Sequence, residues 1–143
     1  MGSINWKKVL LGGIVAGIIN DVGEGIFEGV ILGPQWRQVM QALGHPLQET
    51  GGQMVLHTLL GFAYGITAVW VYAAIRPRYG AGPKTALYAA LGVWVIGYVL
   101  PSFNWGSRGL FPAQLMVSAS LGELVEIVLA TLAGAWLYQE KGS

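Results

Sequence analysis

The sequence predicts an all-α integral membrane protein, a four-transmembrane-helix bundle with a short amphipathic helix in the first external connection. Hydrophobic residues make up 54% of the 143 residues and charged residues only 10%, whereas soluble domains are about 25% charged. Four apolar stretches are also long enough to cross a hydrocarbon core about 30 Å thick. We expect residues 1–143 to form a single transmembrane domain.

Four apolar segments account for the expected spans, and the short polar turns between them favour antiparallel neighbours in a bundle. The first is interpreted as a retained helix and not as a cleaved signal peptide, because it contains three acids and lacks a clear cleavage site. The third is the shortest, and we expect it to end at Pro101. The predicted helices cover residues 8–32, 53–75, 84–101 and 114–138.

The first external connection, residues 33–52, carries a helical pattern of its own. Its apolar residues recur at helical spacing, with polar residues on the opposite face. This pattern predicts a short amphipathic helix that lies on the external surface of the membrane. Two interpretations stay open: an ordinary segment that caps the bundle, or a lid over a site that opens outward. The apolar positions are Trp36, Val39, Met40 and Leu43.

Basic residues gather on one side of the expected bundle. Six of the eight Lys and Arg residues lie at the N-terminus, in the 76–84 turn or at the C-terminus, and the opposite side holds only Arg37 and Arg108. By the positive-inside rule, both termini are expected to be cytoplasmic. The six residues are Lys7, Lys8, Arg76, Arg78, Lys84 and Lys141.

Five of the seven acidic residues fall within the predicted spans. On an ideal helix, Asp21, Glu24 and Glu28 lie within about 60° of one another, and Glu123 and Glu126 share one face of the fourth helix. Both faces also carry small residues, so we expect the acids to point into the bundle and not into lipid. The first helix runs outward and the fourth inward, which places the two groups at similar depth.

These acids are expected to converge with His57 of the second helix on one polar pocket in the outer half of the bundle. The candidate ion-binding or proton-carrying residues are Asp21, Glu24, Glu28, Glu123, Glu126 and His57. If the ion is a metal, its candidate ligands are Glu24, Glu123, Glu126 and His57. Supporting hydrogen bonds are expected from Asn20, Tyr64 and Ser120, and further ones from Thr67 and Tyr98.

The free-energy cost of a charge inside the membrane indicates that this acidic cluster has a function. A charged side chain at the centre of a span costs about 2.5 to 3.5 kcal/mol. Lys8 and Lys84 stand only at the first residue of two predicted spans, and no Lys or Arg lies in the interior of a span to offset this cost. The acids must hold protons, bind a cation, or pair with positive charge from a partner subunit. A set of protonated acids that only links the helices by hydrogen bonds is the structural alternative.

Three functions remain open at this stage. The first is binding or conduction of a cation, either a proton or a divalent metal ion, in a homo-oligomer. The second is an accessory subunit of a larger respiratory or photosynthetic complex, where His57 would ligate a pigment or haem. The third is a carboxylate–metal membrane enzyme, disfavoured because no Glu-x-x-His motif is present. The cofactor is unknown, no catalytic residue is assigned, and a partner nucleic acid is not expected because the basic residues are scattered.

Two short segments carry a resemblance. The opening Ile4-Asn5-Trp6-Lys7-Lys8 and the later Gly33-Pro34-Gln35-Trp36 resemble a group of small, uncharacterised bacterial inner-membrane proteins with four predicted helices. The resemblance implies a location in the bacterial inner (plasma) membrane and no particular activity. In size and helix count the chain is also similar to the small multidrug resistance transporters, which use a membrane-embedded Glu for proton exchange. It lacks their motif around Glu24, so no residue role is carried over.

Overall fold

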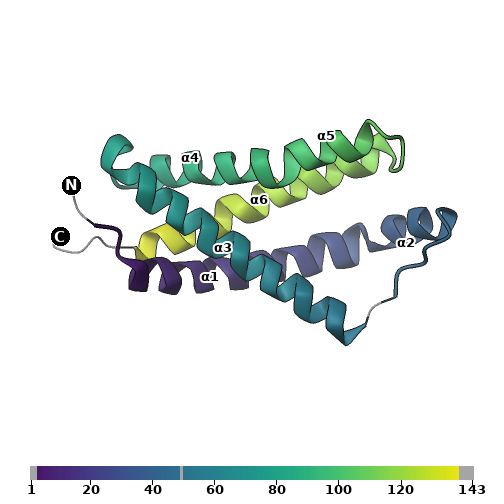
Figure 1. The fold of residues 1–143 in the computed structure, drawn as a ribbon, viewed down its shortest axis with the longest axis horizontal. Coiled ribbons are helices and arrows are strands. Elements are labelled where there is room, and N and C mark those ends of the chain that lie inside the picture. The colour runs from purple at the N-terminus through teal and green to yellow at the C-terminus, as the bar shows by residue number, and fades with distance from the viewer. Residues whose placement is uncertain (1–2, 49, 139–143) are drawn as a thin grey trace.

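The protein is described by a computed structural model that covers residues 3–48 and 50–138. Four helical segments of this part of the chain are long and apolar enough to cross a membrane, which confirms the predicted fold class. They run along the long axis of the molecule, and both termini lie at one end (Figure 1). We call this the terminal end and the opposite one the far end. The segments are Trp6–Ile31, Gly51–Tyr79, Pro83–Gly106 and Ala113–Leu137.

Two of the four segments change their helix type along their length. The first begins as α1 (Trp6–Glu24) and continues as the π-helix η1 (Gly25–Ile31). The third is α4 (Pro83–Trp94), the π-helix η2 (Val95–Val99) and α5 (Leu100–Gly106) in sequence. The other two are α3 (Gly51–Tyr79) and α6 (Ala113–Leu137). Between the first two segments lies α2 (Gly33–Ala42), the short helix expected in the first connection.

The third segment does not end at Pro101, so that prediction is wrong. Pro101 lies in the first turn of α5, directly after η2, and the helix continues to Gly106. Pro101 lacks the N–H that would donate to the carbonyl oxygen four residues earlier in an α-helix. The π-helical turn directly before it has a different hydrogen-bond spacing, and the helix continues through the proline.

Close contact between α1 and α3 depends on the glycines expected to form a small-residue face. A Cβ atom at Gly13 would lie 2.6 Å from the Ile66 Cα, and one at Gly17 would lie 2.8 Å from the Phe62 Cα. The two backbones therefore approach as only glycine permits. α1 also packs on α6, and α4 packs on both α3 and α6, which closes the four-helix bundle.

The apolar core of the bundle lies towards the terminal end. It includes Val9 and Ala16 of α1, Val69 of α3 and Ala130 of α6, all fully buried. The backbone N–H of Asn5 donates to the Tyr138 hydroxyl oxygen over 3.2 Å, which ties the beginning of α1 to the end of α6. In this half of the molecule the four helices pack closely around the apolar core.

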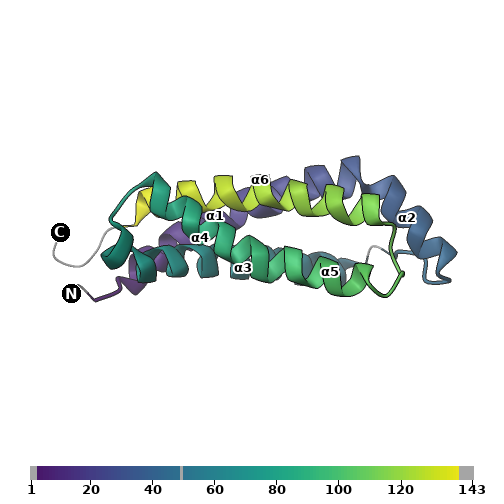
Figure 2. The ribbon, with the colours of Figure 1, turned by 90° about the horizontal axis from the view of Figure 1, so that it is seen from above.

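The far half is more open, because α3 separates from the other helices there (Figure 1), while α5 and α6 stay side by side (Figures 1 and 2). Every residue from 51 to 60 of α3 is exposed, whereas buried residues recur from Gly61 onward. α2 continues beyond η1 at the far end, and the Trp36 ring packs against Phe111 with ring centroids 5.6 Å apart. Figure 1 shows that α2 does not fold back over the bundle, which does not favour the lid interpretation.

Candidate functional site

Three acidic side chains of the first segment line the inner face of the far half. Asp21 and Glu24 lie in the last turns of α1, and Glu28 lies in η1, where the hydrogen-bond spacing differs from that of an α-helix. All three are half-buried. The helix phase predicted from 100° per residue therefore places them correctly on one face, even though Glu28 belongs to a π-helical segment.

The α6 carboxylates lie opposite them at the same depth. Glu126 is only 7% exposed, and its carboxyl group lies against Gly23 of α1, where a Cβ atom would be 2.7 Å from the Glu126 Cγ. Glu123 is half-buried one turn nearer the far end. α1, η1 and α6 thus bring the two predicted acidic groups together within one chain.

Glycines make the room that these carboxylates occupy. A Cβ atom at Gly61 of α3 would overlap the Asp21 Oδ1 atom, and one at Gly122 of α6 would overlap the Phe27 ring. Gly23, Gly61 and Gly122 are therefore part of the site, because they let the acids and one aromatic ring lie between closely packed helices. Helix periodicity alone does not predict this role for them.

His57 extends the site on the side of α3. Its Nδ1 atom lies 3.4 Å from the Glu24 Oε1 atom, and its side chain is 65% exposed while that of Glu24 is 30% exposed. The predicted proximity of His57 to the acids is thus present in the structure. His57 lies at the rim of the cluster, because the first turns of α3 diverge from the bundle.

Aromatic side chains form the remaining wall. The Tyr64 and Tyr98 rings stack with centroids 4.8 Å apart, and the Tyr64 hydroxyl donates to the Gly97 carbonyl oxygen over 3.4 Å. The Tyr98 hydroxyl lies close to both Asn20 and Glu123. Tyr64, Asn20 and Tyr98 therefore lie beside the carboxylates.

Two indole groups contribute to the site in ways that the sequence pattern does not predict. The Trp94 Nε1–H donates to the Ser120 carbonyl oxygen over 2.7 Å, so the observed contact of Ser120 uses its backbone and not its hydroxyl. The Trp36 Nε1–H of α2 donates to Glu28 Oε2. Thr67, a further candidate, is exposed on α3.

Hydrogen-bonding capacity in the site is left unused. Asn20 is 1% exposed and Glu126 is 7% exposed, yet the Asn20 Oδ1 and both Glu126 carboxyl oxygens have no hydrogen-bond partner among the described residues. A buried acceptor without a partner costs about 1–3 kcal/mol. Three further buried oxygens in the same condition are Asp21 Oδ1, Glu28 Oε1 and Glu123 Oε2.

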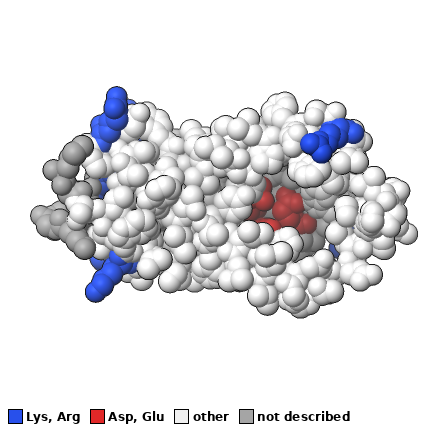
Figure 3. Space-filling view, in the orientation of Figure 1, with Lys and Arg blue, Asp and Glu red and all other residues white. Residues whose placement is uncertain are grey.

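The cluster opens sideways through the wall of the bundle. Figure 3 shows acidic side chains at the bottom of a hollow on a long side of the molecule, between its middle and the far end. The helices run along this long axis (Figure 1), so the hollow faces across the bundle and not along it. Towards the terminal end, the tight apolar core lies beyond the cluster.

The side chains are not arranged as a compact chelating site. Within residues 3–48 and 50–138, no three His, Asp or Glu side chains come close enough together to hold one metal ion. The metal-ligand set predicted from Glu24, Glu123, Glu126 and His57 thus gains no geometric support. His57 lies at the exposed rim while Glu126 lies deep against α1, which explains the separation.

In comparisons with known proteins, no family model, curated protein or solved structure matches the chain.

Proposed function

We propose that this multi-pass membrane protein binds and exchanges a cation, in the first place the proton, at the intramembrane carboxylate cluster. The supporting observation is the set of buried oxygens without partners on Asn20, Asp21, Glu28, Glu123 and Glu126. Ionised carboxylates at this depth would each cost about 2.5 to 3.5 kcal/mol. A bound proton removes the charge and supplies the missing hydrogen-bond donor, so it meets both requirements at once.

The proton is favoured over a chelated divalent metal because the acids lie on opposite walls. Glu126 projects from α6 towards Gly23, and Asp21 projects from α1 towards Gly61. Divalent metals of the Mg²⁺ and Ca²⁺ type need about six or more oxygen ligands in one sphere. Protons need only neighbouring acceptors, and Glu28, Glu24 and Glu123 supply these between the far end and Glu126.

We also propose an orientation in the bacterial inner membrane with both termini in the cytoplasm. Five of the described Lys and Arg residues lie at the terminal end and two, Arg37 and Arg108, at the far end. Lys141, which also contributed to this prediction, lies outside the described residues. Under the positive-inside rule, the carboxylates then lie in the outer half of the membrane. The terminal-end core closes the path to the cytoplasm, so exchange takes place from the outer half.

The second candidate function is that of a subunit whose hollow is covered by a partner protein. The exposure of the first turns of α3 favours this alternative. The first ten residues of α3 are exposed on every side, and they include large apolar side chains. Positive charge on such a partner would neutralise the acids directly. A second copy is a less suitable cover for the hollow itself, because acids would then face acids. The exposed apolar residues are Met54, Val55, Leu56, Leu59 and Leu60.

The proposal is tested with purified protein in weakly buffered detergent solution. A pH step is applied, and the protons that the protein takes up or releases are followed with a pH-indicator dye in the solution. Replacing Glu24 and Glu126 together by Gln keeps their size and removes two proton carriers, so fewer protons should be exchanged per chain than by the wild type. The full chain should remain helical by circular dichroism.

The matched control is Thr131→Val. Thr131 is also buried in α6, but its hydroxyl donates within the helix to the Ile127 carbonyl oxygen over 2.6 Å. Its removal should leave proton exchange at the wild-type level. Equal exchange by the wild type and the double variant, with both folded, would contradict the proposal. Stoichiometric co-purification of a basic partner would instead support the subunit alternative.

A further inference from the structure

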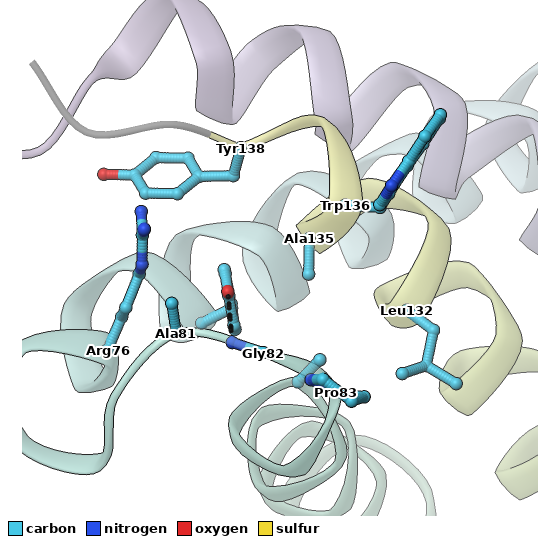
Figure 4. A pocket seen from close by; sticks show the side chains of 10 residues that line it. Arg76, Ala81, Gly82, Pro83, Leu132, Ala135, Trp136 and Tyr138 are labelled. Atoms are coloured by element: carbon cyan, nitrogen blue, oxygen red, sulfur yellow. Dashed lines mark hydrogen bonds between the residues drawn. The ribbon is translucent and has the colours of Figure 1, made fainter. Parts of the chain in front are cut away.

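A cavity of about 420 Å³ lies at the terminal end, away from the carboxylate cluster. Figure 4 shows it between the last turns of α3, the turn that leads into α4, and the end of α6. Its volume falls within the range of about 300–1,000 Å³ that is typical of small-molecule sites. Nothing in the proposed proton chemistry uses this cavity.

Arg76 provides the charge of this cavity. Its guanidinium group lies beside the Tyr138 ring, 5.6 Å from the centroid (Figure 4). The Arg76 Nη1 atom is buried and has no hydrogen-bond partner, and no carboxylate pairs with Arg76 within the described part of the chain. Because a guanidinium stays charged at all physiological pH values, an anion from outside the described residues would be a suitable acceptor for this buried donor.

A hydrogen bond fixes the position of the turn beside Arg76. The Gly82 N–H donates to the Tyr72 hydroxyl oxygen over 3.2 Å, drawn as a dashed line in Figure 4. Gly82 has a φ of +126°, a backbone conformation that favours glycine. This contact fixes the start of α4 on the cavity wall, where the partial positive charge of a helix N-terminus adds to that of Arg76.

The opposite wall of the cavity is apolar. Leu132 and Ala86 line it, and the neighbouring Trp136 side chain is 82% exposed. An exposed Trp near the end of a span is typical of the interface between lipid headgroups and acyl chains. The cavity thus combines an anion-attracting side with an apolar side at the depth where headgroups lie.

We propose that this cavity binds the phosphate group of an anionic phospholipid. A guanidinium matches the paired oxygens of a phosphate by two parallel hydrogen bonds, and basic pockets between transmembrane helices are suited to anionic headgroups. Free phosphate has the same anion chemistry, but it leaves the apolar wall of Leu132 and Trp136 without a partner. A lipid fills both sides of the cavity.

The test is native mass spectrometry of the full chain in detergent, with phosphatidylglycerol and phosphatidylcholine added in equal amounts. We expect the wild type to retain phosphatidylglycerol preferentially and Arg76→Gln to reduce that preference about tenfold. The matched control is Arg78→Gln, since Arg78 is exposed two residues further along α3 and does not line the cavity. Arg78→Gln should keep the preference.

Three results would overturn the proposal. The first is an equal loss in both variants, which would indicate only a general effect of surface charge. The second is binding of inorganic phosphate that depends on Arg76 without any lipid preference, which would assign the cavity to a soluble anion. The third is the absence of a headgroup preference in the wild type, and this measurement decides the matter even if Arg76→Gln does not fold.

Discussion

At the scale of single residues, Gly23 sets the distance between α1 and the deepest carboxylate. The Glu126 Cγ, Cδ and Oε2 atoms would lie 2.7, 3.0 and 3.3 Å from a Cβ atom at this position. The carboxyl group therefore occupies space that any other residue would fill. Glu126 remains 7% exposed because α1 can come this close.

We expect Gly23→Ala to destabilise the protein by about 1–3 kcal/mol, the usual penalty for forcing an extra group into a packed interior. Thermal unfolding in detergent, followed by circular dichroism, measures the change. The control is Gly92→Ala in α4, where a Cβ atom would meet nothing within 4 Å. That substitution should be neutral or stabilise the helix by about 0.5–1 kcal/mol.

A double-mutant cycle ties the Gly23 penalty to Glu126 itself. In a Glu126→Ala background, the side-chain atoms that the added methyl group would meet are gone, so the penalty of Gly23→Ala should shrink by a coupling of about 0.5–3 kcal/mol. A penalty of the same size in both backgrounds would show that Gly23 serves the backbone and not the carboxylate.

The convergence of the acids could be predicted from the sequence, whereas their immediate neighbours could not. Helix phase and depth depend only on position along the chain, and these bring Glu24 and Glu126 to one level. The contact of Gly23 with Glu126 and the donation from Trp36 to Glu28 depend on how the elements cross and turn. A single sequence contains no direct signal for these angles.

At the scale of elements, the first turns of α3 depend on local interactions more than on packing. Residues 51–60 are all exposed, and the helix begins with a capping box. The Gln53 N–H donates to the Thr50 Oγ1 over 3.3 Å, and the Thr50 N–H donates to the Gln53 Oε1 over 3.2 Å. These bonds satisfy donors that the helix start would otherwise leave free.

Thr50→Ala should therefore loosen the start of α3 and leave its middle intact. Loss of an N-cap costs about 1 kcal/mol, which corresponds to about fivefold faster amide exchange in residues 53–60. Hydrogen–deuterium exchange with mass spectrometry in detergent measures this, and residues 65–73 serve as the internal reference. Thr58→Ala is the matched control because Thr58 is exposed within the same helix. Equal exchange in both variants would contradict a role for the cap.

For most ends of the four spans, the predicted position lies within a few residues of the observed one, because hydropathy depends only on the local sequence. The exception is the third span, where Pro101 was interpreted as a stop and the helix runs on to Gly106. The π-helical turn η2 lies just before this proline and contacts α6. Hydropathy alone does not indicate such a change of helix type. Pro77 of α3 likewise lies inside a helix, so a proline alone does not fix a helix end in this chain.

At the scale of the whole molecule, charge is divided along the bundle axis. Lys7, Lys8 and Arg76 are among the basic residues of the terminal end, the carboxylates lie in the far half, and the apolar core separates the two. The anion site proposed at one end and the proton site proposed in the other half are both consistent with this division. The direction of proton exchange then depends on which end faces the cytoplasm.

We expect a fluorescent protein fused after Ser143 to be bright in bacterial cells, because it folds in the cytoplasm, and alkaline phosphatase at the same place to be inactive. The same reporters inserted at Gly44, in the turn after α2 at the far end, should give the opposite pattern. Six of the eight basic residues favour this orientation. The reverse pattern at both sites would place the carboxylates in the cytoplasmic half of the membrane. The proton site would keep its geometry, but it would then exchange with the cytoplasm, and the apolar core would close the path to the outside.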